Sequence, residues 1–216
     1  MKYNIKIGLT PTKLCYSICY IFIFALIRGV RSSSEIGGAM DAYVAFLAII
    51  FFSDTFYQEL QEKRWEVFYL KPAQAKFKTM CQRMLVQASY MGLLIGMGYW
   101  AFYLQRSLGQ LDAKELQIYI TAVLACFASV VFFGTFTFTM VNAFRNLWAG
   151  IGVALLLWYV QSSRWARNLP DILNLFAYEG GYKTGTWIEG KLFALFLSIL
   201  LLLINYRLLN RQERVR

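Results

Sequence analysis

One carboxylate lies well inside an apolar run of this sequence, where a charge could do chemistry. Asp54 belongs to the run that extends from Asp41 to Gln58. A charge at membrane depth is costly, and it usually marks an ion or substrate pathway or pairs with another group. We therefore weigh two hypotheses. Asp54 lines a pathway, or it lies near the inner end of its helix, where a basic loop residue pairs with it or water solvates it. The second is favoured because such charges usually find a partner.

Catalytic and cofactor chemistry has little support elsewhere in the chain. The absence of histidine removes the commonest metal ligand and the usual general base. The stretch 180–185 (GGYKTG) has no glycine directly before its lysine, so it does not match a nucleotide-binding P-loop. We predict that this chain is not an enzyme, holds no metal or cofactor and does not hydrolyse nucleotide. The cysteines form no paired metal-ligand pattern and are read as packing residues: Cys15, Cys19, Cys81 and Cys126.

The composition indicates the elements that must position Asp54. Of 216 residues, 58% are hydrophobic and only 16% are charged, and the charges are concentrated between long apolar runs. The mean hydropathy is +0.46. This pattern predicts an all-α integral membrane protein, a single transmembrane domain over residues 1–216, since about 20 apolar residues are needed to cross the hydrocarbon. Six segments qualify: about Leu14–Val30, Asp41–Gln58, Met84–Leu104, Ile118–Met140, Leu147–Gln161 and Lys191–Leu209.

The distribution of lysine and arginine predicts the orientation. With six spans, both tails and the even-numbered connections share one side, which holds 14 of the 22 basic residues. Basic residues are enriched on the cytoplasmic side of membrane proteins. We therefore predict a multi-pass protein of the plasma membrane with both termini cytoplasmic. The net charge of +10 is better explained in this way than by nucleic-acid binding, because the charges cluster at the ends of apolar runs.

The longest cytoplasmic connection runs from Tyr57 to Arg83 between the second and third spans. It places apolar and aromatic residues beside charges outside the bilayer, which a merely solvated loop would not need. A short amphipathic helix that docks on a partner fits this composition, and so does one that lies on the membrane surface. The residues that carry this interpretation are Glu62, Trp65, Glu66, Phe68, Tyr69, Leu70 and Pro72.

The connection before the last span, residues 162–190, predicts a short external helix. Leu169, Ile172, Leu173 and Phe176 fall at helical spacing on one face. Asn168 followed by Pro170 is typical of a helix start, and Gly180-Gly181 of a helix end. We expect the four apolar side chains to be buried in the outer leaflet or against the bundle.

Two patterns inside the spans favour packing over function. Gly92 and Gly96 have the spacing that lets two helices approach closely, within one bundle or between copies. Thr135, Thr137 and Thr139 are two residues apart, so they do not form one polar stripe. We expect their hydroxyls to bond back to carbonyls of their own helix.

The order of these elements resembles that of the permease subunit of type-2 ABC exporters, over nearly the whole chain. That family tends to have, after the second helix, an acid, two apolar residues and a proline six positions after the acid; Glu66, Phe68, Tyr69 and Pro72 match this spacing. The family's glycine three residues before the acid is Lys63 here. A long apolar helix that ends in an aromatic residue and a basic tail is also typical, and residues 201–214 are similar.

The resemblance implies a mechanism and partners. The chain would be the permease of an ATP-driven exporter, paired with a second copy or a related permease, in membrane lipid. A separate ABC ATPase would hold ATP and magnesium. The connection around Glu62–Arg83 would act as the coupling helix that passes nucleotide-driven motion to the spans, with Val141–Asn146 as a smaller second contact. An amphipathic substrate such as a peptide, a lipid or a drug-like compound fits the aromatic and apolar spans.

Two other functional classes remain alternatives. A non-transporting membrane scaffold or immunity-type protein has the same helix pattern, because six helices alone do not specify function. An intramembrane enzyme is disfavoured by the missing histidine and by the lack of clustered carboxylates.

Overall fold

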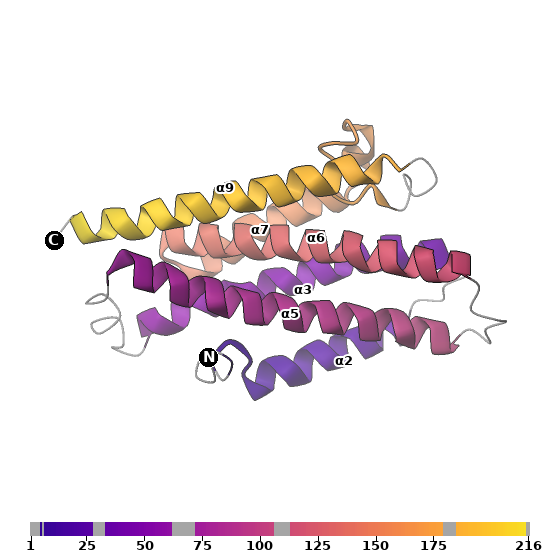
Figure 1. Cartoon of the computed structure of the whole chain (residues 1–216), viewed down its shortest axis with the longest axis horizontal. Helices are drawn as coiled ribbons and strands as arrows, with labels where there is room; N and C mark the ends of the chain where they lie inside the picture. The colour runs from indigo at the N-terminus through magenta and orange to yellow at the C-terminus, as the bar shows by residue number, and fades with distance from the viewer. Residues whose placement is uncertain are drawn as a thin grey trace.

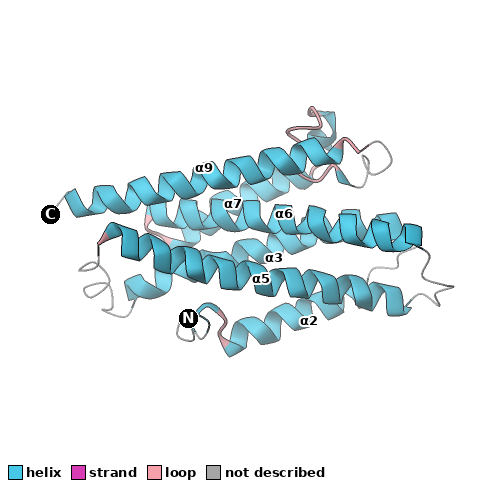
Figure 2. Ribbon diagram, viewed as in Figure 1, coloured by secondary structure: helices cyan, strands magenta, loops and turns pink. Residues whose placement is uncertain are grey.

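A computed structural model describes residues 5, 7–27, 33–61, 72–105, 113–178 and 185–214. Within these ranges the chain is helical and has no β-strand (Figure 2). The α-helices are α2 (Pro11–Ile27), α3 (Ser33–Gln61), α5 (Ala73–Gln105), α6 (Ala113–Phe144), α7 (Leu147–Ser162) and α9 (Trp187–Arg214), and a 3₁₀ helix, η1, spans Arg164–Asn168.

The helices lie roughly along one long axis (Figure 1). The start of α2, the end of α9 and the facing ends of α3 and α5 lie toward one end of the bundle, together with the turn between α6 and α7. The segment 163–178 lies at the opposite end.

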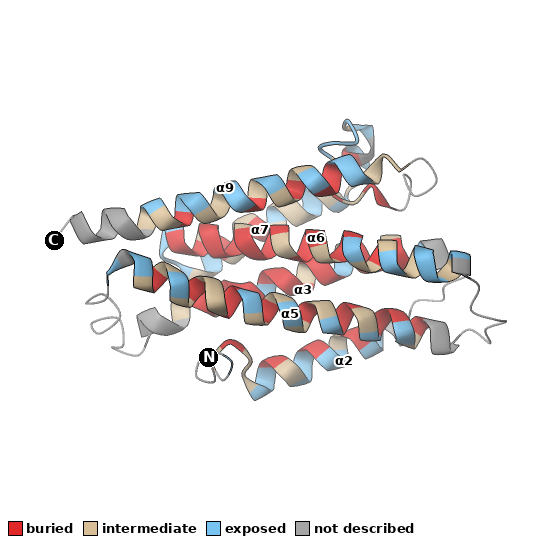
Figure 3. Cartoon of the chain, viewed as in Figure 1, coloured by how far each residue is buried: buried red, intermediate tan, exposed pale blue. Residues whose placement is uncertain are grey.

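The centre of the bundle is formed by α3 and α6, which pack on each other more extensively than any other pair of described elements. In the apolar 18-residue part of Glu35–Thr55 in α3, 72% is buried inside the protein, against 44% for the corresponding part of Lys114–Phe144 in α6 and 22% for that of Trp187–Leu208 in α9. The other helices therefore surround α3, and α9 presents most of its surface outward (Figure 3).

Those same three stretches are long and apolar enough to cross a membrane. The apolar helices Pro11–Phe24 and Leu147–Ser162 are shorter. In α5, polar and small residues such as Gln87, Ser89 and Gly92 interrupt the apolar sequence. By length and composition the protein is a membrane protein with at least three candidate spans.

An exposed apolar stripe on α9 supports the membrane assignment. Five large side chains repeat every three or four residues and are each 47–61% exposed: Ile188, Leu192, Phe196, Ile199 and Leu203. Such spacing places them on one helix face. Soluble monomers rarely expose a continuous apolar patch of this kind, whereas lipid covers it without cost.

Every expected span overlaps a helix, but two of the helices begin earlier in the chain than the sequence predicts. Pro11 begins α2, because proline fits the first helical turn, where its missing N–H is not needed. Lys13 is therefore a helix residue and not part of a preceding tail. Likewise α3 begins at Ser33, which puts Asp41 inside the helix and not at its start.

The predicted amphipathic helix at 168–176 is wrong. The residues form η1 and then a series of turns, in which the Pro170 carbonyl accepts the N–H groups of Leu173 (2.8 Å) and Asn174 (3.2 Å). Ile172 and Leu173 are 43% and 42% exposed. The helical spacing of the apolar residues does not produce a helix here, because Pro170 and Asn174 favour turns. The buried apolar residues between positions 163 and 178 are Ala166, Leu175, Ala177 and Tyr178.

The threonine prediction is confirmed. The hydroxyls of Thr135, Thr137 and Thr139 donate to carbonyls three or four residues earlier in α6, at 2.6–3.0 Å. Gly92 and Gly96 pack inside the chain, since a Cβ on each would contact Phe127 and Tyr119 of α6 respectively.

A two-residue turn joins α6 to α7. Arg145 has φ 52°, the only positive φ of a described non-glycine residue. The side-chain oxygen of Asn146 then accepts the N–H groups of Trp148 (3.0 Å) and Ala149 (3.3 Å), which caps α7. Gly150 permits the close approach of α7, because a Cβ there would lie 2.6 Å from the backbone nitrogen of Val141.

Candidate functional site

Most residues of the predicted coupling helix cannot be placed. Glu62, Trp65, Glu66, Phe68, Tyr69 and Leu70 lie outside the described residues. Pro72 is described and exposed. Its carbonyl accepts the N–H groups of Ala75 (2.9 Å) and Lys76 (3.1 Å) and so starts α5. The coupling role of all seven residues remains a prediction.

Asp54 forms an ion pair with Lys13, which extends from the first turn of α2. The ammonium group of Lys13 also donates to the carbonyl of Phe51 at 2.8 Å and lies 4.8 Å from the centre of that ring. The side chain of Lys13 is only 6% exposed, and that of Asp54 is 25% exposed. Asp54 thus has the kind of partner that the pairing hypothesis requires, although the partner comes from a helix and not from a loop.

A second set of polar contacts adjoins this pair. Thr55 donates to the side-chain oxygen of Gln87 at 2.8 Å, and the amide nitrogen of Gln87 donates to the carbonyls of Gly8 and Phe51, both at 3.3 Å. Arg83 donates to the carbonyl of Thr55 at 3.4 Å. Together Lys13, Asp54, Thr55, Arg83 and Gln87 form what we call the α3–α5 cluster.

The α3–α5 cluster joins four parts of the chain: α2, α3, α5 and the described residues before α2 (5 and 7–10), which we call the N-terminal segment. Thr55, Arg83 and Gln87 are at most 3% exposed. Buried hydrogen bonds of this kind are costly to break, because each leaves an unpaired polar group. Thr55 lies six residues before the end of α3 and Arg83 ten residues after the start of α5, so the cluster holds together the two helices that flank the 62–71 connection.

A second buried ion pair lies near the other end of the bundle. Lys191 of α9 pairs with Asp41 of α3, and it also donates to the hydroxyl of Ser129 on α6 and to the carbonyl of Leu175, both at 2.6 Å. We call Asp41, Ser129 and Lys191 the α3–α9 cluster. All three donors of the Lys191 ammonium group are used, and the cluster ties the 163–178 segment to three helices.

Asp41 is the more deeply placed carboxylate. It is fully buried, and it lies 13 residues before Asp54, which is about 20 Å along a helix. Its Oδ1 atom has no hydrogen-bond partner among the described residues. The sequence pattern does not reveal this role, because Asp41 and Lys191 each stand at the start of a predicted span, where a charge is expected to be solvated. The apolar and small residues 36–40 before Asp41 are the signal that could have revealed it.

A neutral pair joins α6 to α9 in the same half of the bundle as the α6–α7 turn. Asn142 donates to the side-chain oxygen of Asn205 at 3.0 Å, and Asn205 donates to Thr139 at 2.7 Å. Both asparagines are at most 1% exposed. Interhelical amide contacts of this kind hold membrane helices in register.

The clusters are suited to holding helices in place. In each of the two ion pairs, a lysine ammonium group contacts an aspartate carboxylate. The remaining contacts are to hydroxyl, amide and carbonyl groups of neighbouring elements. Among the residues that the structure describes, no group of three or more histidine, cysteine, aspartate or glutamate residues could hold a metal ion.

Comparison of the chain with models of known protein families, with curated proteins and with solved structures finds no match in any of the three.

Proposed function

We propose that the chain is the transmembrane permease subunit of an ATP-driven exporter, with six spans and both termini in the cytoplasm. It would act with a second copy or a related permease and with a separate ATPase of the ABC class, which would hold ATP and magnesium. The cargo would be an amphipathic compound such as a peptide, a lipid or a drug-like molecule.

The observation that carries this proposal is the α3–α5 cluster. A permease without its own nucleotide site must receive energy through a contact, and an element that moves as one body is needed to pass it on. The 62–71 connection joins α3 to α5, and buried contacts from Thr55 to Gln87 and Arg83 hold these helices together. Displacement of the connection would therefore move both helices, and α2 with them through Lys13.

The arrangement of the ends supports the same proposal. The facing ends of α3 and α5 share one end of the bundle with the start of α2, the α6–α7 turn and the end of α9 (Figure 1). An ATPase bound at that end could contact the 62–71 connection and the 141–146 region together.

The test is the association of the chain with an ATPase. The full chain is purified from its native membrane, and the amount of co-purified protein that carries a P-loop and hydrolyses ATP is measured. Changing Phe68 and Tyr69 together to alanine removes two aromatic side chains from the connection. Loss of an interface anchor costs about 2 kcal/mol or more, so recovery of the ATPase should fall by at least roughly thirtyfold.

The control is a double variant of matched chemistry, Phe22→Ala with Phe196→Ala. These rings are 48% and 56% exposed, and both lie on helices away from the connection. This variant should recover the ATPase as the unchanged chain does. If the unchanged chain recovers no ATPase, or if the Phe68 and Tyr69 variant inserts normally and recovers it fully, the exporter proposal fails and a non-transporting scaffold is favoured.

A further inference from the structure

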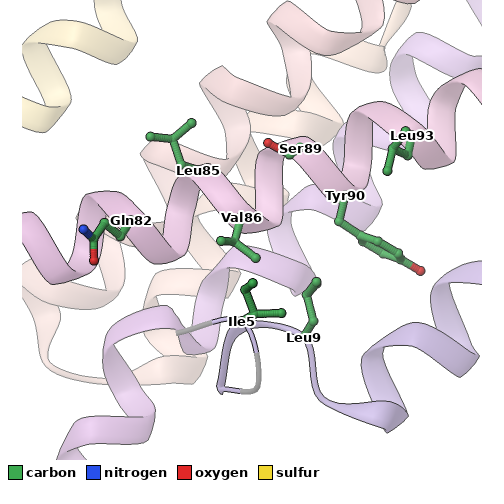
Figure 4. Close-up of a pocket in the computed structure, with 8 residues that line it drawn as sticks. All are labelled: Ile5, Leu9, Gln82, Leu85, Val86, Ser89, Tyr90 and Leu93. Carbon is green, nitrogen blue, oxygen red and sulfur yellow. The ribbon is translucent and has the colours of Figure 1, made fainter. Parts of the chain in front are cut away.

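An open groove runs along α5 beside the N-terminal segment (Figure 4). It has a volume of about 350 Å³, and its lining is almost entirely apolar. We call it the α5 groove. Two of its lining residues come from the N-terminal segment and six from α5: Ile5, Leu9, Gln82, Leu85, Val86, Ser89, Tyr90 and Leu93.

Polar contacts on the buried side fix the walls of the α5 groove. Gln87 donates to the carbonyl of Gly8 at 3.3 Å, which holds the N-terminal segment against α5. The hydroxyl of Tyr90 lies 2.8 Å from that of Ser17 on α2. The ring of Tyr90 also stacks on Phe51 of α3, with centroids 5.5 Å apart. The groove is therefore part of the packed bundle.

The shape of the α5 groove suits a hydrocarbon chain. From Gln82 to Leu93 the groove extends about 17 Å along the helix, so its volume corresponds to a mean cross-section of roughly 20 Å². A chain packed at carbon–carbon contacts of about 4 Å needs roughly 16–20 Å². A helix about 10 Å wide has a cross-section of roughly 80 Å², so a whole helix is too wide to lie inside the groove.

A positive charge marks one end of the same face of α5. Lys78 is exposed and lies one turn before Gln82, in the series 78, 82, 85, 89 and 93 that defines one helix face. From Lys78 to Leu93 the helix rises about 22 Å. Half a bilayer with its headgroups is about 20–22 Å thick. If Lys78 is level with the lipid phosphates, Leu93 is therefore near the midplane.

We propose that the α5 groove binds one phospholipid, whose acyl chain lies between the N-terminal segment and α5 and whose phosphate is bound by Lys78. Leu85 and Leu93 are 66% and 70% exposed, and the acyl chain covers them. The charge at Lys78 favours an anionic headgroup over a zwitterionic one. This binding site is independent of whether the chain transports a substrate.

The experiment places the full chain in lipid nanodiscs with phosphatidylglycerol that carries a diazirine near the end of one acyl chain. After illumination, the labelled peptides are mapped. Label should concentrate on Ile5, Leu9 and residues 82–93. Ser89→Trp fills the groove and should reduce that label at least fivefold. Its control, Gly152→Trp, adds the same ring at an exposed site on α7 with no neighbour within 4 Å, and it should leave the label unchanged.

The headgroup contact is tested separately with Lys78→Gln. One basic residue near the membrane surface changes the binding of an anionic lipid about fivefold. Label from phosphatidylglycerol should fall by that factor, while label from phosphatidylcholine with the same diazirine changes little. Lys114→Gln, at an exposed lysine of α6, is the matched control and should alter neither.

Two outcomes overturn the proposal. Label spread evenly over all lipid-facing helices, or equal label in the Ser89→Trp and Gly152→Trp variants, shows bulk lipid contact only. Efficient cross-linking of two chains through single cysteines at Leu85 or Leu93 shows that a second copy occupies this face. Thermal unfolding of each variant is measured alongside, and the Lys78 arm keeps the test decisive if Ser89→Trp does not fold.

Discussion

Replacing Lys191 with methionine removes the partner of a buried carboxylate while keeping a side chain of similar length. Asp41 is fully buried, and the change also removes the donors to Ser129 and Leu175. Removing one partner of a buried pair costs about 3–5 kcal/mol. For a chain of this size each kcal/mol lowers the unfolding temperature by about 2–4 °C. We therefore expect a decrease of roughly 6–20 °C.

The double variant Asp41→Asn with Lys191→Met separates charge from packing. It removes both charges, so only the hydrogen bonds are lost, at about 1 kcal/mol each, and it should unfold at a higher temperature than Lys191→Met. The assay follows Cys126, a buried free thiol, with a thiol-reactive dye during heating, after serine replaces Cys15, Cys19 and Cys81. Equal unfolding temperatures for the single and double variants would refute the reasoning, because they would show that Asp41 and Lys191 are not coupled.

Three further predictions concern packing and orientation. Gly37→Leu should destabilise the chain by about 1–3 kcal/mol through overpacking, because even a Cβ there would lie 2.1 Å from the ring of Tyr178; unchanged unfolding in the same dye assay contradicts that packing. Asn205→Leu removes two hydrogen bonds to α6 and should lower the free energy of unfolding by about 1–3 kcal/mol. Unfolding by titration with a denaturing detergent measures this loss, and an unchanged free energy would show that the two bonds contribute nothing. In a cysteine-free chain, an impermeant maleimide applied to intact cells should label a cysteine at Asp171 and not one at Gln74; the opposite pattern inverts the predicted orientation.

The helices were predictable because they depend on local sequence. Long apolar runs between charged segments predicted a helix at each of six places. The hydroxyl bonds of Thr135, Thr137 and Thr139 were predictable for the same reason, since each is made within one helix. The start of α3 was not predictable, because a carboxylate in an otherwise apolar run looks like the end of a span until its partner is known.

The clusters depend on contacts that local pattern does not encode. Lys191 is 150 positions from Asp41, and Lys13 is 41 positions from Asp54. A charged residue near the end of an apolar run is expected to be solvated, and only the folded bundle shows that it is buried. The 168–176 prediction is wrong for a different reason: four apolar residues have helical spacing there, but Pro170 and Asn174 favour turns.

The short turn between α6 and α7 has a consequence for how the chain enters the membrane during synthesis. Residues 145 and 146 alone separate the two helices, so one cannot be inserted while the other remains far from the translocation channel. At 16 residues, α7 is about 24 Å long, shorter than the hydrocarbon core of about 30 Å. It is therefore a weak insertion signal by itself. In the proposed six-span arrangement, α7 would enter attached to the 32-residue α6, as the second arm of a hairpin, and lengthening this turn should separate the two insertion steps.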